Sequence, residues 1–178
     1  MKKQAGFTLV ELLTVVALIG ILAAIAVPMM KPMWENARYK EAVRDVTSAL
    51  RDARSRAIAR NLECRVCFDL DAGTSWLEEG NQASGSTLWS TVHDYGMPQG
   101  VLLAADAWGG DCAVTTGEHY IEFNPNGTSE NDIPSPTSAF VCIMDTTGIR
   151  KYATGIRSNT TGSIRIQRRD SADTAWSD

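Results

Sequence analysis

The chain has 178 residues and a formal net charge of −4, and the charge is unevenly distributed. Between Lys31 and Asn61 there are eight Lys and Arg and four Asp and Glu. From Leu62 to the end there are seven and sixteen, a net charge of −9. The length accommodates one domain and an anchor and excludes a series of domains. The acidic body opposes long-range attraction to nucleic acid, so only a local basic surface could bind DNA.

An apolar run extends without interruption from Phe7 to Met30, and Glu11 is its only ionisable side chain. As a helix these 24 residues reach about 36 Å, which is enough to cross a bilayer core of about 30 Å. The run is longer than the roughly 7–15 apolar residues of a signal peptide. A plain anchor leaves Glu11 unexplained, because a carboxylate inside a membrane span is costly. We therefore predict a transmembrane segment over residues 7–30 with a functional carboxylate.

The start of this run has a specific pattern, in which a basic leader over residues 1–6 ends at Gly6 and is followed by Phe7 and then Glu11. The pattern resembles the processing site of type IV prepilins and of the pseudopilins of type II secretion. The resemblance implies that a prepilin peptidase cuts between Gly6 and Phe7 and methylates the new amino group of Phe7. It also implies that Glu11 pairs with that amino group on a neighbouring subunit, which relieves the penalty of a carboxylate in lipid.

The same resemblance implies a location in the cell. The protein would be a single-pass protein of the bacterial inner membrane, with its leader in the cytoplasm and its C-terminal head in the periplasm. Its partners would be other pilins or pseudopilins, which bind through the N-terminal helix.

Pro28 and Pro32 lie at the end of the apolar run, where we expect the helix to bend and continue. From residue 31 to residue 61 apolar residues recur at spacings of three and four and charges occupy the other faces, which is typical of an amphipathic helix. The apolar stripe is narrow and rich in alanine, so it suits close packing on a sheet. Its members are Tyr39, Ala42, Val43, Val46, Ala49, Leu50, Ala53, Ala57 and Ile58.

Beyond residue 62 the apolar period changes to two, which indicates β-strands. We predict an antiparallel, sandwich-like β head over residues 62–178, with a polar loop at 80–90 and a frayed tail from residue 170. The uncharged strand 140–144 is expected at the centre of a sheet. The fold class is α+β, with one long kinked helix carrying this head. The predicted strands are 64–68, 76–79, 101–103, 120–124, 140–144, 151–156 and 163–167.

Several segments of the body resemble the GspH/FimT family of minor pseudopilins and minor pilins. The resemblance implies one kinked N-terminal helix that carries a β-sandwich-like head. The segments that carry it are Leu50–Ile58, Ile121–Gly127, Cys142–Gly148 and Thr161–Arg165.

All four cysteines, Cys64, Cys67, Cys112 and Cys142, lie in the body, and an even number in an exported domain predicts disulfides. Cys64 and Cys67 on one strand would lie about 10 Å apart, too far to bridge each other. We therefore expect them to form disulfides with Cys112 and Cys142. Free thiols and a metal site at the C-x-x-C pair are the alternatives, and the presence of only two His disfavours the metal.

The sequence contains no convincing catalytic constellation. Ser90, His93 and Asp94 are close in sequence, but a triad is recognised by geometry, and a surface loop explains the three residues. We therefore predict a structural protein without catalytic residues, cofactor or metal, and not a membrane-tethered enzyme.

The segment 150–169 holds six basic residues and no acidic one. One interpretation is a polar sheet edge that resists aggregation. The other is contact with DNA phosphates through Arg165, Arg168 and Arg169. Minor pilins similar to FimT take up DNA through a Gly-Arg-x-Arg motif near the C-terminus. Here the matching residues are Gly162–Arg165, in which Ser163 replaces the first Arg.

These features predict a minor pseudopilin that resembles the H-type subunit of a type II secretion system. It would join the tip of a short periplasmic filament that supports the export of folded proteins. The alternative is a minor pilin at the tip of a type IV pilus, with a contribution to DNA uptake.

Overall fold

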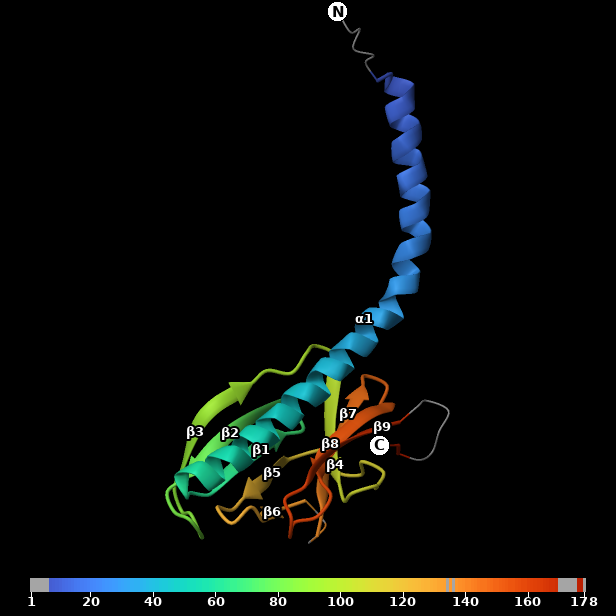
Figure 1. Cartoon of the computed structure of the whole chain (residues 1–178). Helices are drawn as coiled ribbons and strands as arrows, with labels where there is room; N and C mark the ends of the chain where they lie inside the picture. Colours follow the sequence, from blue (N-terminus) through green and yellow to red (C-terminus); the bar gives the residue numbers. More distant parts are fainter. Residues whose placement is uncertain (1–6, 134, 136, 170–175, 178) are drawn as a thin grey trace, which may run out of the picture. The chain divides into compact units, whose positions relative to one another are not determined.

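The computed structural model describes residues 7–133, 135, 137–169 and 176–177. One long helix, α1 (Leu9–Arg60), is followed in these residues by strands that form two antiparallel sheets (Figure 1). This architecture confirms the predicted α+β fold class. The strands are β1 (Cys64–Asp69), β2 (Thr74–Gly80), β3 (Trp89–Tyr95), β4 (Val101–Asp106), β5 (Glu118–Phe123), β6 (Ser129–Asn131), β7 (Ala139–Asp145), β8 (Arg150–Ile156) and β9 (Ile164–Arg168).

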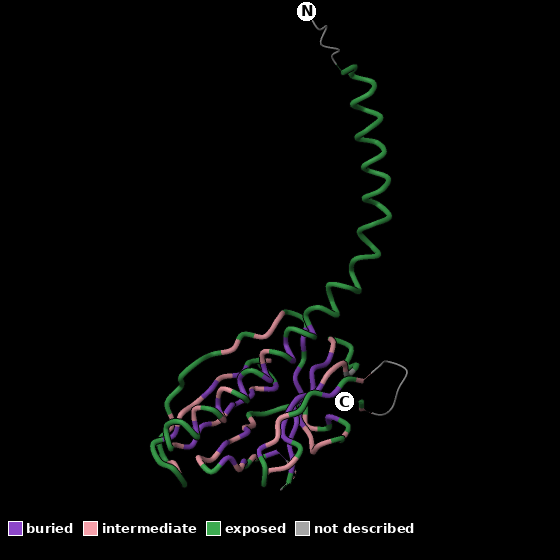
Figure 2. Tube along the Cα trace, viewed as in Figure 1, coloured by how far each residue is buried: buried purple, intermediate pink, exposed green. Residues whose placement is uncertain are grey.

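Contacts divide the chain into two compact units, residues 1–37 and residues 38–178. In the first unit α1 runs through Pro28 and Pro32 without ending, as predicted. Every residue of α1 in this unit is exposed (Figure 2). Within the described residues α1 is the one helix long and apolar enough to cross a membrane. A helix that is apolar on all faces is stable only when lipid or another protein surrounds it.

In the second unit α1 is amphipathic, and its apolar stripe forms one side of the core. Eight of the nine predicted stripe residues are buried, from Tyr39 to Ala57, and Thr47 is buried with them. Ile58 is the exception, because it is 53% exposed at the end of the stripe. Full burial of Val46 and Leu50 contributes about 1.5–3 kcal/mol each. The alanines let the helix axis approach the sheets closely.

The main core lies between α1 and the inner faces of both sheets. In the five-stranded sheet, ordered β3-β2-β1-β5-β6, the buried Val66 pairs with Leu77 on one side and Ile121 on the other. In the four-stranded sheet, ordered β4-β7-β8-β9, β7 contains the uncharged segment 140–144 and lies inside the sheet, as predicted. Six of its seven residues are buried, so both of its faces are covered.

The structure differs from the prediction in four segments of the head. The short strand β6 was not expected. Residues 89–95, expected as a polar loop in part, form β3, an exposed edge strand that pairs with β2. The strand expected at 101–103 extends to Asp106, and its residue Ala105 forms an antiparallel β-bridge with Val114. Ser177 pairs with Arg168, so the prediction of a frayed tail is wrong at residues 176–177. The expectation for residues 170–175 and 178 lies outside the described residues.

A short polar relay fixes α1 to the four-stranded sheet. The hydroxyls of Thr47 on α1 and Thr154 on β8 lie 2.8 Å apart, and both residues are buried. The Thr154 hydroxyl also lies 3.1 Å from the carbonyl oxygen of Arg165 on β9, to which it donates. The Thr47 hydroxyl also contacts the Val43 carbonyl on its own helix, so the contacts run from Val43 through Thr47 and Thr154 to the Arg165 carbonyl, and either hydroxyl can donate to the other. Because buried hydroxyls are costly without partners, this relay specifies the register of helix and strands.

We expect Thr154→Val to destabilise the head by about 1–3 kcal/mol, because it leaves buried polar groups without their partner at unchanged side-chain volume. Thermal unfolding of the full chain in detergent checks this, with a lower Tm by several degrees as the expected result. Thr154→Ser keeps the hydroxyl and should retain more of the stability. The exposed Thr160→Val is the matched control, and an equal loss of Tm in both valine variants would contradict the relay.

Candidate functional site

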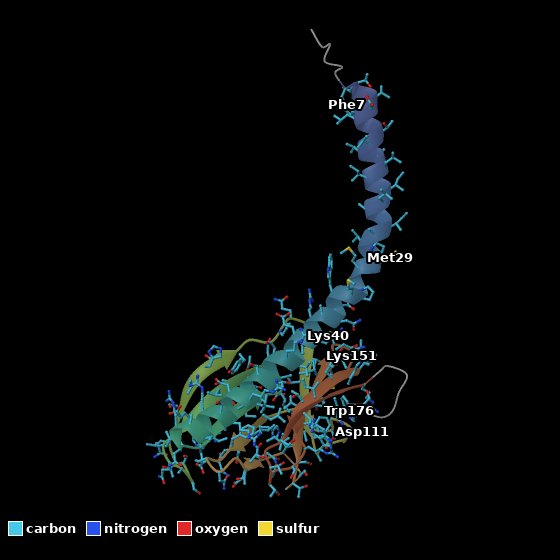
Figure 3. All side chains as sticks on the ribbon, in the orientation of Figure 1. Phe7, Met29, Lys40, Asp111, Lys151 and Trp176 are labelled. Carbon is cyan, nitrogen blue, oxygen red and sulfur yellow. A yellow bond between two sulfur atoms is a disulfide. The ribbon has the colours of Figure 1, made fainter. Side chains whose placement is uncertain are left out.

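The predicted processing site lies at the start of the described chain. Gly6 is outside the described residues, so the structure describes one side of the predicted scissile bond. Phe7 is 78% exposed and precedes the helix, which begins at Leu9. From Phe7 to Met29 the side chains project outward on all sides of the chain (Figure 3).

Glu11 lies in the first turn of α1, and Thr8 caps that turn. The backbone N–H of Glu11 donates to Thr8 Oγ1 at 3.2 Å, and the N–H of Leu12 donates to the Thr8 carbonyl at 3.2 Å. The spacing from Thr8 to Glu11 is that of a capping box. A carboxylate at this position is also favoured by the helix dipole. The cap therefore places an exposed carboxylate four residues after Phe7.

Sequence reasoning singled out Glu11, whose role stays a prediction, and did not consider Thr8. The available signal was a threonine three residues before a glutamate, immediately ahead of an apolar run. The role of Thr8 is to fix where the helix begins, and therefore the position of Glu11 relative to the chain end.

The three arginines proposed as a DNA contact do not share one surface. Arg165 and Arg168 are three residues apart on β9, so their side chains leave opposite faces of the strand. Arg169 lies 3.4 Å from the Asp111 carboxylate and 5.5 Å from the Trp176 ring. The three arginines therefore do not form one continuous basic surface for DNA phosphates.

Trp176 covers the outer face of the four-stranded sheet near the disulfide. Its indole N–H donates to the Gly110 carbonyl at 2.9 Å, and its ring lies edge-on to Phe140 at 5.5 Å. Trp108 also lies edge-on to Phe140, with the ring centroids 6.0 Å apart. These aromatic contacts explain why residues 176–177 are held against the sheet in a segment of polar composition.

The cysteines form one disulfide, between Cys112 and Cys142, which belongs to the same outer cluster. Cys64 and Cys67 are free thiols. This corrects the expected pairing, because both lie on β1, in the other sheet. Burial raises the pKa of Cys64 to about 11. Burial, followed by the nearby Glu78 carboxylate, raises that of Cys67 to about 12.

The outer face of the five-stranded sheet has a small cavity of about 180 Å³ whose polar groups bind one another. Arg65 forms an ion pair with Glu78 at 2.7 Å, and its guanidinium lies 4.0 Å from the Trp89 ring. The Cys67 thiol donates to the same Glu78 carboxylate at 3.5 Å. These contacts stabilise the cross-strand packing of β1, β2 and β3.

The residues considered for catalysis are placed along β3. The Ser90 hydroxyl donates to the Glu79 carbonyl at 3.3 Å, and the His93 ring lies against Tyr95 at 4.5 Å. The described part of the chain contains no hydrogen bond between Ser90 and His93 and no group of three or more His, Cys, Asp or Glu arranged to hold a metal.

Two family models match the chain. One, described as the prokaryotic N-terminal methylation motif, matches residues 1–27. The other, described as type II transport protein GspH, matches residues 42–177, which is most of the chain. The chain belongs to the GspH family.

Similar proteins extend the GspH assignment to the pilin-like group. A fimbrial protein of Pseudomonas aeruginosa is 49% identical over 103 residues, which cover 58% of this chain and 54% of that protein. The type IV major fimbrial protein FimA of Dichelobacter nodosus is 34% identical over 115 residues, which cover 65% and 68%. The chain spans about half the length of the first relatives it matches.

The fold has a solved counterpart. The minor pseudopilin EpsH from the type 2 secretion system of Vibrio cholerae superposes with a TM-score of 0.53 at 14% identity, covering 74% of this chain and 97% of EpsH. This likeness shows the fold. The family models and the fimbrial relatives identify the GspH-family chain as a pilin-like protein. Its family is structural, and its N-terminal motif implies processing by a prepilin peptidase.

We expect the mature protein to begin at N-methylated Phe7. Mass spectrometry of protein purified from membranes checks this through the N-terminal peptide. Gly6→Ala is a conservative change next to the scissile bond and should leave the leader attached in part or in full. A mature terminus after Ala24 or Ala26 would instead indicate ordinary signal-peptide cleavage.

We expect the thiols to differ in accessibility. Iodoacetamide should leave the native protein unlabelled near neutral pH, because the Cys64 and Cys67 thiols are buried and protonated and the other two cysteines are bonded. After unfolding without reductant, peptide mapping should find label on Cys64 and Cys67 alone.

The double variant Cys112→Ala with Cys142→Ala should lower the free energy of unfolding by about 3–4 kcal/mol, because the disulfide closes a loop with a sequence separation of 30. Label on all four cysteines before reduction would contradict the assigned disulfide.

Proposed function

We propose that the protein is a minor pseudopilin at the tip of a type II secretion pseudopilus, where it supports export of folded proteins across the outer membrane. The observation that carries the proposal is the match of one type II transport family model to residues 42–177, the greater part of the chain. The apolar, exposed part of α1 anchors the subunit in the inner membrane and packs against other pseudopilins in the filament. The head lies in the periplasm.

In this proposal Glu11 provides the driving force for leaving the lipid. The carboxylate is held in the first helical turn by the Thr8 cap and is exposed. In the bilayer it has no counter-charge on its own helix over residues 9–30. The methylated amine of Phe7 on a neighbouring subunit supplies that charge, so the cost of the lone carboxylate is relieved by assembly.

A second candidate function is supported by the fimbrial relatives. At 49% identity over part of the chain, the similarity to a fimbrial protein is substantial. In this alternative the subunit is a minor pilin at the tip of a type IV pilus. Cleavage, anchoring and the role of Glu11 are the same in both functions, so the exported or assembled product distinguishes them.

We expect deletion of the gene to stop export of folded proteins into the medium while surface pili remain. The wild-type gene should restore export. With Glu11→Gln, export should stay at least about tenfold below the level that the wild-type gene restores, because the amide removes the charge that pairs with the neighbouring amine. The measurement is the ratio of secreted to periplasmic protein, together with the amount of the subunit in sheared filaments.

Glu35→Gln is the matched control, since Glu35 is also an exposed acid of α1 but follows the apolar run. It should restore export fully, and both variants should fractionate with the membrane. Loss of surface pili with unchanged export would favour the minor-pilin function. Full assembly of Glu11→Gln would contradict the pairing.

A further inference from the structure

A groove of about 620 Å³ lies between the C-terminal part of α1 and the segment that leads into β9. Three arginines line it, Arg51 and Arg54 from α1 and Arg165 from β9. Among the described residues, no aspartate or glutamate lines it. The remaining lining residues are Ser55, Ile58, Thr161, Ser163 and Ile164.

Arg54, one of the lining residues, is held in place by the fold. Its Nη2 donates to the Thr161 carbonyl at 3.0 Å, whereas its Nε is buried and makes no hydrogen bond within the described chain. Gly162, with a φ of 55°, lets the loop approach the turn between β5 and β6, because a Cβ there would clash with the Gly127 carbonyl. The guanidinium is therefore positioned by the fold, with part of its donor capacity unused.

The positive charge of the groove is not balanced by the described part of the chain. Arg51, Arg54 and Arg165 form no ion pair there, and the acid next to Arg51, Asp52, pairs instead with Arg56 at 2.9 Å. Guanidinium groups keep their charge at all relevant pH values. Like charges at a spacing of three or four residues on a helix, such as Arg51 and Arg54, are mildly destabilising. The arrangement thus reduces stability unless an external anion occupies it.

Apolar groups in the groove indicate what kind of anion fits. Ile58 ends the buried stripe of α1 but is 53% exposed, and it lines the groove together with the half-buried Ile164. A phosphate chain would leave these aliphatic surfaces without a partner. Single-stranded nucleic acid is usually bound on aromatic side chains, and no aromatic residue of the described chain lines this groove. A peptide with carboxylates next to an aliphatic side chain satisfies both kinds of surface.

We propose that this groove, formed by Arg51, Arg54 and Arg165 around Ile58, is a docking site for an acidic peptide segment of a partner protein. The carboxylates bind the guanidinium groups, and an aliphatic side chain of the partner covers Ile58 and Ile164. The site uses the head alone and does not depend on the role of Glu11 or on which filament the subunit joins.

The test uses the full chain in a non-ionic detergent and fluorescence anisotropy with labelled peptides. The first probe is an acetylated peptide of sequence Gly-Asp-Ile-Glu-Gly. The second replaces Asp and Glu with Asn and Gln, and the third replaces Ile with Ser. We expect the first to bind at least about tenfold more tightly than the second, because charge-assisted hydrogen bonds carry the affinity. We expect the third to bind more weakly than the first, and high salt to weaken the first.

Arg51→Gln with Arg165→Gln removes two charges without disturbing the Arg54 contact to Thr161. It should weaken the acidic peptide by at least about tenfold and leave Tm unchanged or slightly higher, because like-charge repulsion falls. Arg44→Gln with Arg157→Gln is the matched control, since it removes the same charge from α1 and from the residue after β8, both exposed and outside the groove. It should bind the peptide as the wild type does.

Three results would overturn the proposal. Equal binding of the charged and amide peptides would show that the arginines do not recognise carboxylates. An equal loss in the control variant would show a general charge effect. If short oligodeoxythymidine bound more tightly than the acidic peptide and lost its affinity in Arg51→Gln with Arg165→Gln, the groove would be a nucleic-acid contact and the acidic-peptide proposal would be wrong.

Discussion

The structure depends on one constraint, which is that the two parts of α1 need different surroundings for their apolar side chains. Its first part exposes large apolar side chains on every face, from Leu9 to Trp34, and has no core of its own to bury them. Its second part buries a narrow stripe against two sheets. Lipid or other subunits can satisfy the first part, and the head satisfies the second. A chain built in this way is stable only as part of a membrane or a filament, which agrees with its membership in a pilin-like family.

The periodicity of the sequence carried most of the information about this helix and its core. A three-and-four spacing predicted the buried stripe, and the error at Ile58 arose because periodicity gives direction but not where the covering sheet ends. β3 was missed because an exposed edge strand buries few side chains and follows a segment rich in Gly and Ser. Trp176 was missed because one aromatic contact outweighs a polar composition.

The candidate sites were predicted unequally, for a physical reason. Glu11 could be singled out because a carboxylate inside an apolar run is anomalous in the sequence itself, and its role in assembly stays a prediction. Disulfide connectivity depends on which sheet a strand joins, and β1 joins the sheet without Cys112 and Cys142. The basic segment after residue 150 looked like one patch, but strand alternation separates Arg165 from Arg168, and Asp111 binds Arg169. A charge pattern along the chain does not determine which charges share a surface.

Arg165 lines the same groove as two arginines that lie more than a hundred positions earlier in the chain. Arg51 and Arg54 lie on the helix that the buried stripe fixes against the sheets, and the relay from Thr47 through Thr154 ends on the backbone of Arg165 itself. The same contacts that hold helix and sheet together therefore bring three guanidinium groups into one groove. Docking of α1 thus stabilises the head and also assembles a basic surface, although it places like charges close together. That combination is physically reasonable when an acidic partner supplies the missing counter-charge. Binding then relieves the repulsion among the arginines of the free head, and this relief favours the complex.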